Sequence, residues 1–335
     1  MQQSFSALKN LVLSDYRFLL VAHKSPDGDA VGSVAGFYFL LKNLNRSVEV
    51  VLPDPPASNI APFLEGTGCL FYSKNPTEVE ARIQESDCLI GLDFNAISRV
   101  GDMQQLLAEF KGKKVLIDHH TDPEDYADVL ISQVSCSSTC QLIYECFEGM
   151  DLLSAMDKRA ARSLYLGITT DTGSFRFPSV TAKTHKIVAD LIERGIEHWK
   201  IHQEVFDNNS VDQLQLRGFA ISEKLVLLNK TSQGLPFGYI WLTRSELERY
   251  NYKSGDTEGL VNTILSIEGI KAGVLIQEKS DGIKMSFRSK DEIHVNVFAK
   301  THFNGGGHVY AAGGFSADSM EVTLERLLRL IPELF

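Results

Sequence analysis

One apolar run in this chain ends in three ionisable side chains, and that ending constrains the fold more than any other feature. Residues 115–117 have the composition of a buried strand, and Asp118, His119 and His120 follow directly. A carboxylate and two imidazoles contribute nothing to a hydrophobic core. In open α/β folds, however, the carboxyl ends of strands are where sites are built. The segment therefore predicts a functional edge of a sheet.

Three other segments have the same layout, in which an apolar element is followed by aspartate or histidine. They are residues 19–33, 88–101 and 164–177. The first two are predicted to be strands that end in polar turns, and the third a helix that ends in an aspartate. If all four segments converge, one pocket contains six ionisable side chains: His23, Asp27, Asp29, Asp93, His119 and Asp171.

Four carboxylates cannot all ionise side by side, since like charges raise one another's pKa. The few cations in these segments, such as Lys24 and Arg99, do not balance them, whereas two divalent ions would. Oxygen and imidazole donors without thiolates favour Mn²⁺ or Mg²⁺ over structural zinc, and the histidines favour Mn²⁺. Two ions roughly 3.5–4 Å apart can share one carboxylate, activate water and neutralise charge on phosphorus. This indicates hydrolysis of a phosphoester or phosphoanhydride.

Taken one at a time, these segments have simpler explanations. The Asp-Gly-Asp sequence at 27–29 is a common turn, and Asp93, Asp118 and Asp171 are each compatible with a helix cap. Their combination, each after an apolar element, favours the shared metal site. The sequence contains neither G-x-S-x-G nor G-x-x-x-x-G-K-[ST]. Neither a nucleophilic serine nor a phosphate loop for ATP is therefore expected.

The first half of the chain alternates between predicted strands and helices. Strands are expected at 17–23, 47–52, 89–94 and 114–117, and helices at 28–44, 137–147 and 158–169. Alternation of this kind predicts an α/β domain with a doubly wound, mainly parallel sheet.

Three parts are expected along the chain: a catalytic domain at 1–180, a helical connector at 181–232, and a smaller α/β domain at 233–335. In the last, strands are predicted at 237–242, 273–278 and 283–288, with helices at 258–267 and 293–300. The Asp-Gly pair at 281–282 favours a hairpin. Three glycines at 305–307 weaken any strand or helix there and permit a ligand to approach the backbone.

The composition excludes some classes of protein. The chain has 335 residues, is 44% hydrophobic and 23% charged, and carries a formal net charge of −10. An acidic protein is a poor partner for long duplex nucleic acid, which requires many lysines and arginines. A small nucleotide or short strand held by a metal remains compatible with this charge. No apolar run of 18 residues occurs, so no membrane span is expected.

A cytoplasmic location is expected from the N-terminus and the cysteines. The first residues lack the charged start and long apolar core of a signal peptide. The five cysteines include no C-x-x-C pair, so we expect reduced, mostly buried thiols.

Four segments together resemble the motifs of the DHH (Asp-His-His) phosphoesterase superfamily. They are HKSPDGDAVGS, GLDFNAISRVG, IDHHTDP and ITTDTGSF. The sequence NGGGHVYAAGG, with FRS at 287–289 ahead of it, resembles the signature of the DHH-associated C-terminal domain. The size and two-domain layout are similar to the soluble subgroup of nanoRNases and 3′-phosphoadenosine 5′-phosphate (pAp) phosphatases.

The resemblance implies a role for each residue of the first domain. It assigns His23 and Asp27 to one ion, Asp29 and His119 to the other, a bridging and catalytic position to Asp93, and completion of the second site to Asp171. Asp118 would orient a ligand histidine from outside the first shell. His120 would touch the scissile phosphate or protonate the leaving oxygen.

Substrate-binding residues are implied in both domains. Ser33 and Arg99 are expected to contact phosphate in the first. In the second, Arg288 and His308 would clamp a terminal phosphate or nucleotide, with backbone N–H groups of Gly305, Gly306 and Gly307 donating to it. The positive local charge of 284–308 suits that task.

The resemblance therefore implies a hydrolase with two Mn²⁺ ions, or Mg²⁺ in their place. Its expected substrates are short single-stranded oligoribonucleotides, cut to mononucleotides, and pAp, converted to AMP. A pyrophosphatase or polyphosphatase with the same metal core and a non-catalytic nucleotide sensor are the alternatives. A homodimer is possible on sequence grounds.

Overall fold

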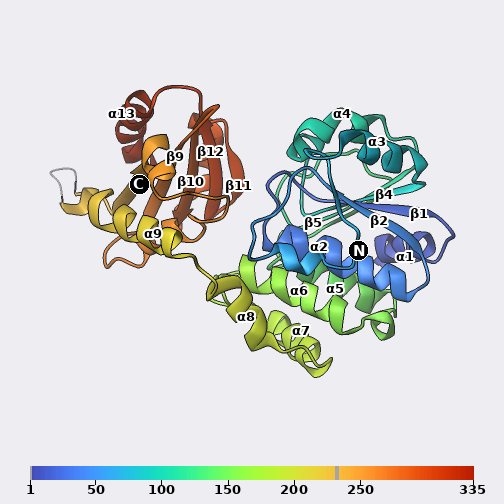
Figure 1. Cartoon of the computed structure of the whole chain (residues 1–335). Helices are drawn as coiled ribbons and strands as arrows, with labels where there is room; N and C mark the ends of the chain where they lie inside the picture. Colours follow the sequence, from blue (N-terminus) through green and yellow to red (C-terminus); the bar gives the residue numbers. More distant parts are fainter. Residues whose placement is uncertain (1, 231–233) are drawn as a thin grey trace. The chain divides into compact units, whose positions relative to one another are not determined.

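The computed structural model describes residues 2–230 and 234–335 and divides into two compact units, Met1–Asn208 and Asn209–Phe335 (Figure 1). Among the described residues, none of the helices is both long and apolar enough to traverse a bilayer.

The first unit contains a six-stranded, entirely parallel sheet in the order β3-β2-β1-β4-β5-β6. Its strands are β1 (Arg17–Val21), β2 (Ser47–Leu52), β3 (Leu70–Phe71), β4 (Cys88–Leu92), β5 (Lys113–Asp118) and β6 (Val129–Ser132). The predicted doubly wound α/β fold is confirmed. The strand order reverses between β1 and β4, and such a reversal opens a crevice at the carboxyl ends of the strands.

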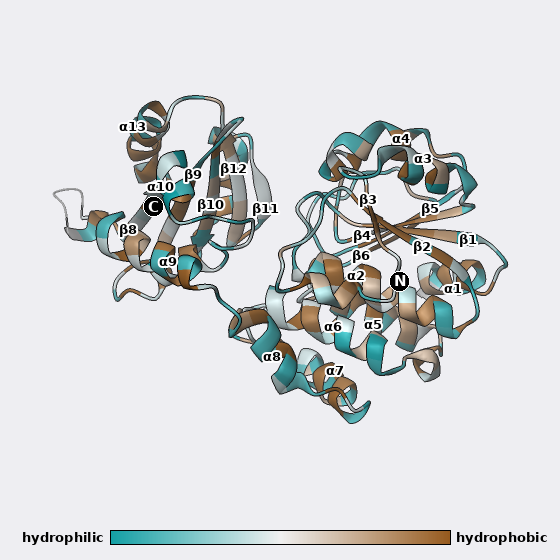
Figure 2. Ribbon diagram, in the orientation of Figure 1, coloured by the Kyte–Doolittle hydropathy of each residue, from teal (hydrophilic) through white to brown (hydrophobic). Residues whose placement is uncertain are grey.

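Helices cover both faces of this sheet (Figure 1). They are α1 (Gln2–Val12), α2 (Gly28–Asn43), α3 (Pro76–Glu85), α4 (Gln104–Glu109), α5 (Thr139–Gly149), α6 (Lys158–Asp171), α7 (Ala182–Glu193) and α8 (His198–Phe206). Alternate strand residues face opposite cores: Leu20 packs with the core of α2, α5 and α6, and Leu19 with that of α3 and α4. Figure 2 shows the central strands as a brown, apolar layer between these helices.

Close packing of α2 against α6 depends on small residues. A Cβ atom on Gly32 would lie 2.5 Å from the Ser163 carbonyl oxygen of α6, and one on Gly167 would lie 2.5 Å from Asp29 Oδ1 of α2. No side chain fits in those spaces, so glycine allows the two helices to approach. This approach brings the first turn of α2 beside the end of α6, where two of the acidic motifs lie.

The second unit contains a mixed six-stranded sheet in the order β11-β12-β10-β9-β8-β7, with β8 and β9 parallel and the other pairs antiparallel. Its strands are β7 (Leu225–Leu227), β8 (Phe237–Leu242), β9 (Ala272–Lys279), β10 (Gly282–Ser289), β11 (Gly306–His308) and β12 (Ala311–Ser316). Its helices are α9 (Val211–Glu223), α10 (Arg244–Arg249), α11 (Leu260–Leu265), α12 (Val295–His302) and α13 (Met320–Leu330). The predicted β9–β10 hairpin is present.

The glycine-rich segment differs from expectation, because Gly306 and Gly307 form the edge strand β11. Cβ atoms on Gly305 and Gly307 would lie 2.0 Å and 2.6 Å from carbonyl oxygens of β12. These two glycines therefore allow two backbones of the same hairpin to approach closely. A ligand is not needed to explain them.

The segment 181–232, expected to be a separate connector, is divided between the units. Ile187 and Leu191 of α7 join the core of the first sheet, whereas Leu216 and Ala220 of α9 pack with the core of the second. Helices α7, α8 and α9 are as expected, whereas Leu225–Leu227 of the same segment forms strand β7 of the second sheet. The predicted limits at 180 and 232 do not coincide with the division near 208, because short apolar faces bind these helices to opposite units.

Candidate active site

The acidic and histidine motifs of the first unit meet at the carboxyl edge of its sheet. His23 follows β1, Asp93 follows β4, and Asp118 ends β5. Since β1, β4 and β5 are neighbours in the sheet, their ends lie side by side. The first turn of α2 adds Asp29, preceded by its N-cap Asp27, and Asp171 is the last residue of α6.

Two groups of potential metal ligands lie within this edge. In the first, His23 Nε2 lies 3.5 Å from Asp93 Oδ2 and 3.8 Å from Asp27 Oδ1. In the second, His119 Nε2 lies 3.4 Å from Asp171 Oδ2 and 3.7 Å from Asp29 Oδ2. The donor atoms of each group all lie within 4.8 Å of one another, as metal ligands would.

Asp93 connects the two groups. Its Oδ2 faces His23, and its Oδ1 lies 3.7 Å from His119 Nε2. The side chain is only 2% exposed. One oxygen toward each group is the arrangement expected of a carboxylate shared by two ions.

Hydrogen bonds to backbone carbonyls fix the ring orientation and the tautomer of both histidines. Nδ1 of His23 lies 2.9 Å from the Lys24 carbonyl, and Nδ1 of His119 lies 3.2 Å from the Cys136 carbonyl. A carbonyl only accepts, so each Nδ1 donates its hydrogen, and in the neutral ring each Nε2 keeps a lone pair directed at the carboxylates. Metal-binding histidines are typically oriented by such a bond.

The electrostatics of the cluster favour the binding of cations. Burial, followed by the charges of Asp29, Asp27, Asp118 and Asp171, raises the pKa of Asp93 well above its usual value. Burial opposes protonation of His119, but Asp171, Asp29 and Asp118 outweigh it and raise its pKa. The charge on these groups is therefore poorly compensated by the protein alone. Hard oxygen donors with imidazole nitrogens fit Mn²⁺ or Mg²⁺, so the residues present suit the expected ions.

Asp118 and His120 form a second feature of the site. His120 Nδ1 lies 2.7 Å from Asp118 Oδ1, and Asp118 is fully buried. The other carboxylate oxygen of Asp118 has no hydrogen-bond partner among the described residues. The imidazole of His120 is 16% exposed, against 4% for His119. Asp118 thus fixes the orientation of His120, which is the more exposed of the two histidines.

The first turn of α5 also belongs to the site, although it was not among the residues predicted from the sequence. The backbone N–H groups of Thr139 and Cys140 donate to the two oxygens of Asp29, at 2.6 Å and 2.9 Å. The Thr139 hydroxyl donates to Asp93 Oδ1 at 2.9 Å. A helix N-terminus offers such donors and favours anions. The Ser-Ser-Thr run at 137–139 was the available signal, since hydroxyl residues mark helix starts.

Two residues expected to contact phosphate have different surroundings. Ser33 is fully buried in α2, with Oγ 3.4 Å from Cys140 Sγ, and this position argues against contact with a substrate. Its helix is buried on nearly every side, which its motif did not reveal. Arg99 lies in the 3₁₀ helix Ile97–Met103, is exposed, and is close enough for its charge to lower the pKa of His23, after the larger effect of burial.

In the second unit, the sheet places Arg288 and His308 on one face. Arg288 of β10 and His308 of β11 both pair with Ala311 of β12, from its two sides. Directly paired residues share a face of a sheet. The Arg288 guanidinium also donates to the Phe287 carbonyl at 2.9 Å. Gly306 and Gly307 belong to the edge strand beside them.

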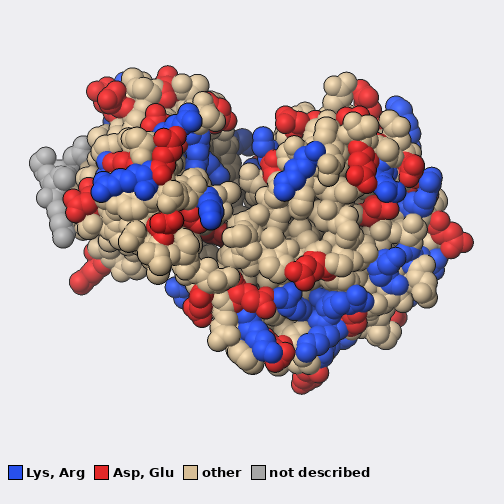
Figure 3. Space-filling view, in the orientation of Figure 1, with Lys and Arg blue, Asp and Glu red and all other residues tan. Residues whose placement is uncertain are grey.

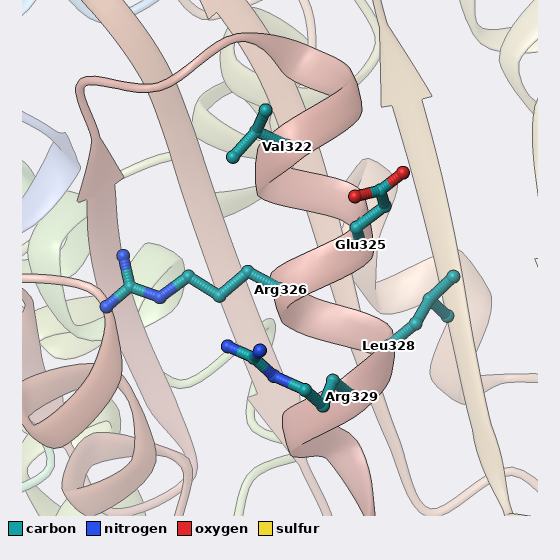
Figure 4. A pocket seen from close by; sticks show the side chains of 5 residues that line it. All are labelled: Val322, Glu325, Arg326, Leu328 and Arg329. Carbon is teal, nitrogen blue, oxygen red and sulfur yellow. The ribbon is translucent and has the colours of Figure 1, made fainter.

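A hollow of about 470 Å³ beside α13 has none of this chemistry. It is lined by Val322, Glu325, Arg326, Leu328 and Arg329 (Figure 4). Its one carboxylate and two guanidinium groups do not form a metal site. On the face drawn in Figure 3, basic and acidic side chains are interspersed. That pattern differs from the basic stripe that binds long nucleic acids.

Comparison with known proteins assigns the chain to a family. Residues 17–168 match the DHH family, N-terminal domain, and residues 239–335 match the DHHA1 domain. The crystal structure of an exopolyphosphatase-related protein from Bacteroides fragilis has a TM-score of 0.90 to this chain and 31% identity, and the match covers 100% of this chain and 98% of that one. The chain belongs to the DHH family.

Two curated relatives in the DHH family are named as bifunctional oligoribonuclease and PAP phosphatase NrnA. The Bacillus subtilis protein is 28% identical over 319 residues, covering 94% of this chain and 95% of the relative. The Thermus thermophilus protein is 27% identical over 316 residues, covering 94% and 89%. The resemblance seen in the motifs is thereby confirmed, and the chain is a phosphoesterase of the DHH family.

Replacement of Asp93 by asparagine tests the charge cluster. Asparagine keeps an acceptor for the Thr139 hydroxyl but removes one of several mutually repelling carboxylates. In chelator, we expect the melting temperature to rise by about 2–4 °C, the shift that about 1 kcal/mol produces in a domain of this size. The increase in melting temperature that Mn²⁺ causes in the wild-type protein should largely disappear in this variant. A lower melting temperature in chelator together with an unchanged Mn²⁺ effect would contradict the arrangement.

The raised pKa values of Asp93 and His119 predict a pH-dependent effect of metal. In the metal-free fold these groups hold protons to higher pH than in the unfolded chain, so they oppose stability increasingly as pH rises through that interval. Metal displaces those protons. The difference in melting temperature between Mn²⁺ and chelator should therefore grow from pH 5 to pH 8. The melting temperatures are measured by scanning calorimetry. A difference that stays constant across this pH range would contradict the prediction.

Proposed function

We propose that this DHH phosphoesterase uses two divalent ions to hydrolyse short oligoribonucleotides to mononucleotides and pAp to AMP. The observation that carries the proposal is the shared position of Asp93 between two groups of histidine and aspartate. Similarity to the NrnA proteins over nearly the whole chain supports the choice of substrates.

Each ion has a set of protein ligands in this proposal. His23 and Asp27 would hold one, Asp29, His119 and Asp171 would hold the other, and Asp93 would be shared between them. Bound there, dications supply polarisation of the phosphoryl group and a lowered pKa for coordinated water. Two histidines favour Mn²⁺, and Mg²⁺ is compatible with the same donors. The backbone N–H groups at the start of α5 keep Asp29 directed at the second group.

His120 is assigned the proton transfer to the leaving oxygen. Its bond from Nδ1 to Asp118 fixes the ring and leaves Nε2 as the nitrogen that faces a substrate. Proton delivery by a positioned side chain typically accounts for a rate factor of about 10²–10⁴. Arg99, exposed near His23, is assigned to contact with phosphate.

Substrate binding by the second unit rests on the face that carries Arg288 and His308. An arginine fork and an imidazole on β10 and β11, the two strands that flank β12, suit a terminal phosphate. Strand β11 is at the edge of its sheet, so backbone N–H groups of Gly306 and Gly307 that point away from β12 can donate to the same group. The N–H of Gly305 is not available, because it donates to the Ala299 carbonyl at 3.1 Å. Recognition of one terminal phosphate limits the length of the substrate and is the physical reason to favour short strands and pAp.

The remaining expectations belong to the same proposal. All five cysteines are free thiols and four are buried, as in a protein of the reducing cytoplasm, where we place its activity. A homodimer remains a proposal that analytical ultracentrifugation tests directly.

A second candidate function is hydrolysis of polyphosphate. It is favoured by one observation, the name of the Bacteroides fragilis protein, which is described as exopolyphosphatase-related. Both candidates use the same metal groups, so they differ only in the recognition of a nucleoside.

A panel of substrates separates these functions. Purified protein with Mn²⁺ is expected to hydrolyse a ribodinucleotide, a five-nucleotide RNA and pAp, to act weakly on a long RNA, and to leave pyrophosphate and tripolyphosphate intact. Product is measured by anion-exchange chromatography, with Asp93→Ala as the inactive control. Turnover of the inorganic substrates alone would transfer the assignment to a polyphosphatase. Nucleotide binding without any turnover by the wild-type protein would indicate a sensor.

Replacement of His120 by asparagine tests proton transfer separately from metal binding. We expect kcat on the dinucleotide to fall by about 10²–10⁴ while Mn²⁺ affinity stays within a few-fold of wild type. Lys113→Met is a suitable control, because Lys113 forms only an exposed ion pair with Asp128 at the start of β5. Steady-state kinetics and calorimetric Mn²⁺ titration give the two quantities. Equal loss of both would make His120 a metal ligand instead.

A further inference from the structure

One buried turn contacts three of the candidate metal ligands. This turn, residues 136–140, leads into α5. The Cys136 carbonyl accepts from His119, the Thr139 N–H donates to Asp29, and the Thr139 hydroxyl donates to Asp93. Cys136 is 2% exposed and Thr139 is fully buried. The position of this turn therefore sets the positions of ligands that come from three different elements.

A buried carboxylate lies behind this turn. The side chain of Glu145, on the second turn of α5, is 5% exposed. Its Oε1 accepts from Gln141 Nε2 at 3.0 Å and faces the Cys136 thiol at 3.7 Å. Its Oε2 lies 2.7 Å from Lys183 Nζ, on α7. Glu145 therefore connects both ends of the turn with a second helix.

Gln141 extends the connection. Its side-chain oxygen accepts from the Ser137 hydroxyl at 2.7 Å and from the Thr184 hydroxyl at 2.9 Å. Thr184 also forms the capping box of α7 with Thr181. We call this set the Glu145 clamp; it comprises Cys136, Ser137, Gln141, Glu145, Lys183 and Thr184.

Stability alone does not account for such an arrangement. Apolar side chains of the same volume usually stabilise a helix interface as well as or better than a buried carboxylate, because they avoid the cost of desolvation. The side chain of Glu145 is buried, although its partner Lys183 is 51% exposed. A satisfied polar network, however, fixes one geometry where apolar packing tolerates several. The Glu145 clamp holds the two ends of the 136–140 turn, whose carbonyl and amide groups orient the ligands.

We propose that Glu145 and Gln141 are positioning residues for the two-ion centre. They hold the 136–140 turn so that the Cys136 carbonyl keeps His119 in the tautomer with its hydrogen on Nδ1, and so that Thr139 holds Asp29 and Asp93. This inference rests on the proposed function, because it assigns these residues to the metal centre. Loss of the clamp lets the turn shift. The ligands are then less well placed, and they bind an ion more weakly.

The test compares Glu145→Ala and Glu145→Gln in the full-length chain with Tyr144→Phe as the matched control. Tyr144 is the adjacent residue of α5, and its hydroxyl bonds Asp190 of the same helix α7 without touching the turn. Three quantities are measured: the Mn²⁺ dissociation constant by calorimetry, the His119 tautomer by imidazole ¹⁵N shifts in the metal-free protein at a pH high enough to keep the ring neutral, and the melting temperature.

We expect Glu145→Ala to weaken Mn²⁺ binding roughly tenfold, the lower limit for loss of a partner outside the ligand shell. Its His119 signal should show a mixture of tautomers. Glu145→Gln keeps the acceptor for Gln141 but loses the charge pairing with Lys183, so its effect should be smaller and in the same direction. If Glu145→Ala does not fold, the Mn²⁺ affinity and His119 tautomer of Glu145→Gln still test the proposal. Tyr144→Phe should lower the melting temperature without changing the other two quantities.

A Glu145 variant that loses stability but keeps the wild-type Mn²⁺ affinity and a single His119 tautomer would overturn the proposal and leave the metal centre standing. Absence of Mn²⁺ binding by the wild-type chain would overturn both, and the wild-type titration alone reveals that case.

Discussion

Mutual repulsion between the buried carboxylate of Asp93 and the carboxylates around it is the constraint on which the rest of this structure depends. Asp93 is 2% exposed and lies within reach of the charges of Asp27, Asp29, Asp118 and Asp171, which raise its pKa. A chain selected only for stability would not keep such a cluster, because removing a charge from it lowers the free energy of the fold. The cluster therefore makes sense as a binding site whose stability is supplied by cations. Where the protein does add compensation, it does so with the N–H groups that begin α5, which lie across from Asp29.

The sheet explains how residues so far apart in the chain reach that point. The strand order places β1 between β2 and β4, and β4 next to β5, so the ends of three strands deliver His23, Asp93 and Asp118 side by side. The helix that follows β1 then carries Asp29 back over the same edge. Its close approach to α6, possible because Gly32 and Gly167 have no side chains, brings Asp171 to the second group. The site is thus a consequence of crossover topology together with two positions where only glycine fits.

Much of the first sheet and of the candidate ligand set was predictable from sequence. The ligands lie directly after apolar elements, and a parallel sheet aligns the ends of its strands. The support around the ligands was not predictable in the same way. Thr139 contacts Asp29 across 110 residues of sequence, and neither residue type alone indicates the contact. Ser33 lies within a recognisable motif but is buried, since α2 is covered on nearly all sides by α5, α6 and the sheet. The glycines at 305–307 indicated close backbone approach correctly, but the partner at Gly305 and Gly307 is strand β12 of the same hairpin.

A metal centre of this kind selects phosphorus chemistry without selecting a substrate, since two cations polarise any phosphoryl group placed between them. Selection must come from groups that meet the rest of the ligand. In the second unit, the pairing of both Arg288 and His308 with Ala311 creates a face that carries their donors on the two strands flanking β12, with β11 at the edge of the sheet. In the proposed function, such a face suits a terminal phosphate. The groups that separate a nucleotide substrate from an inorganic one are then expected in the second unit.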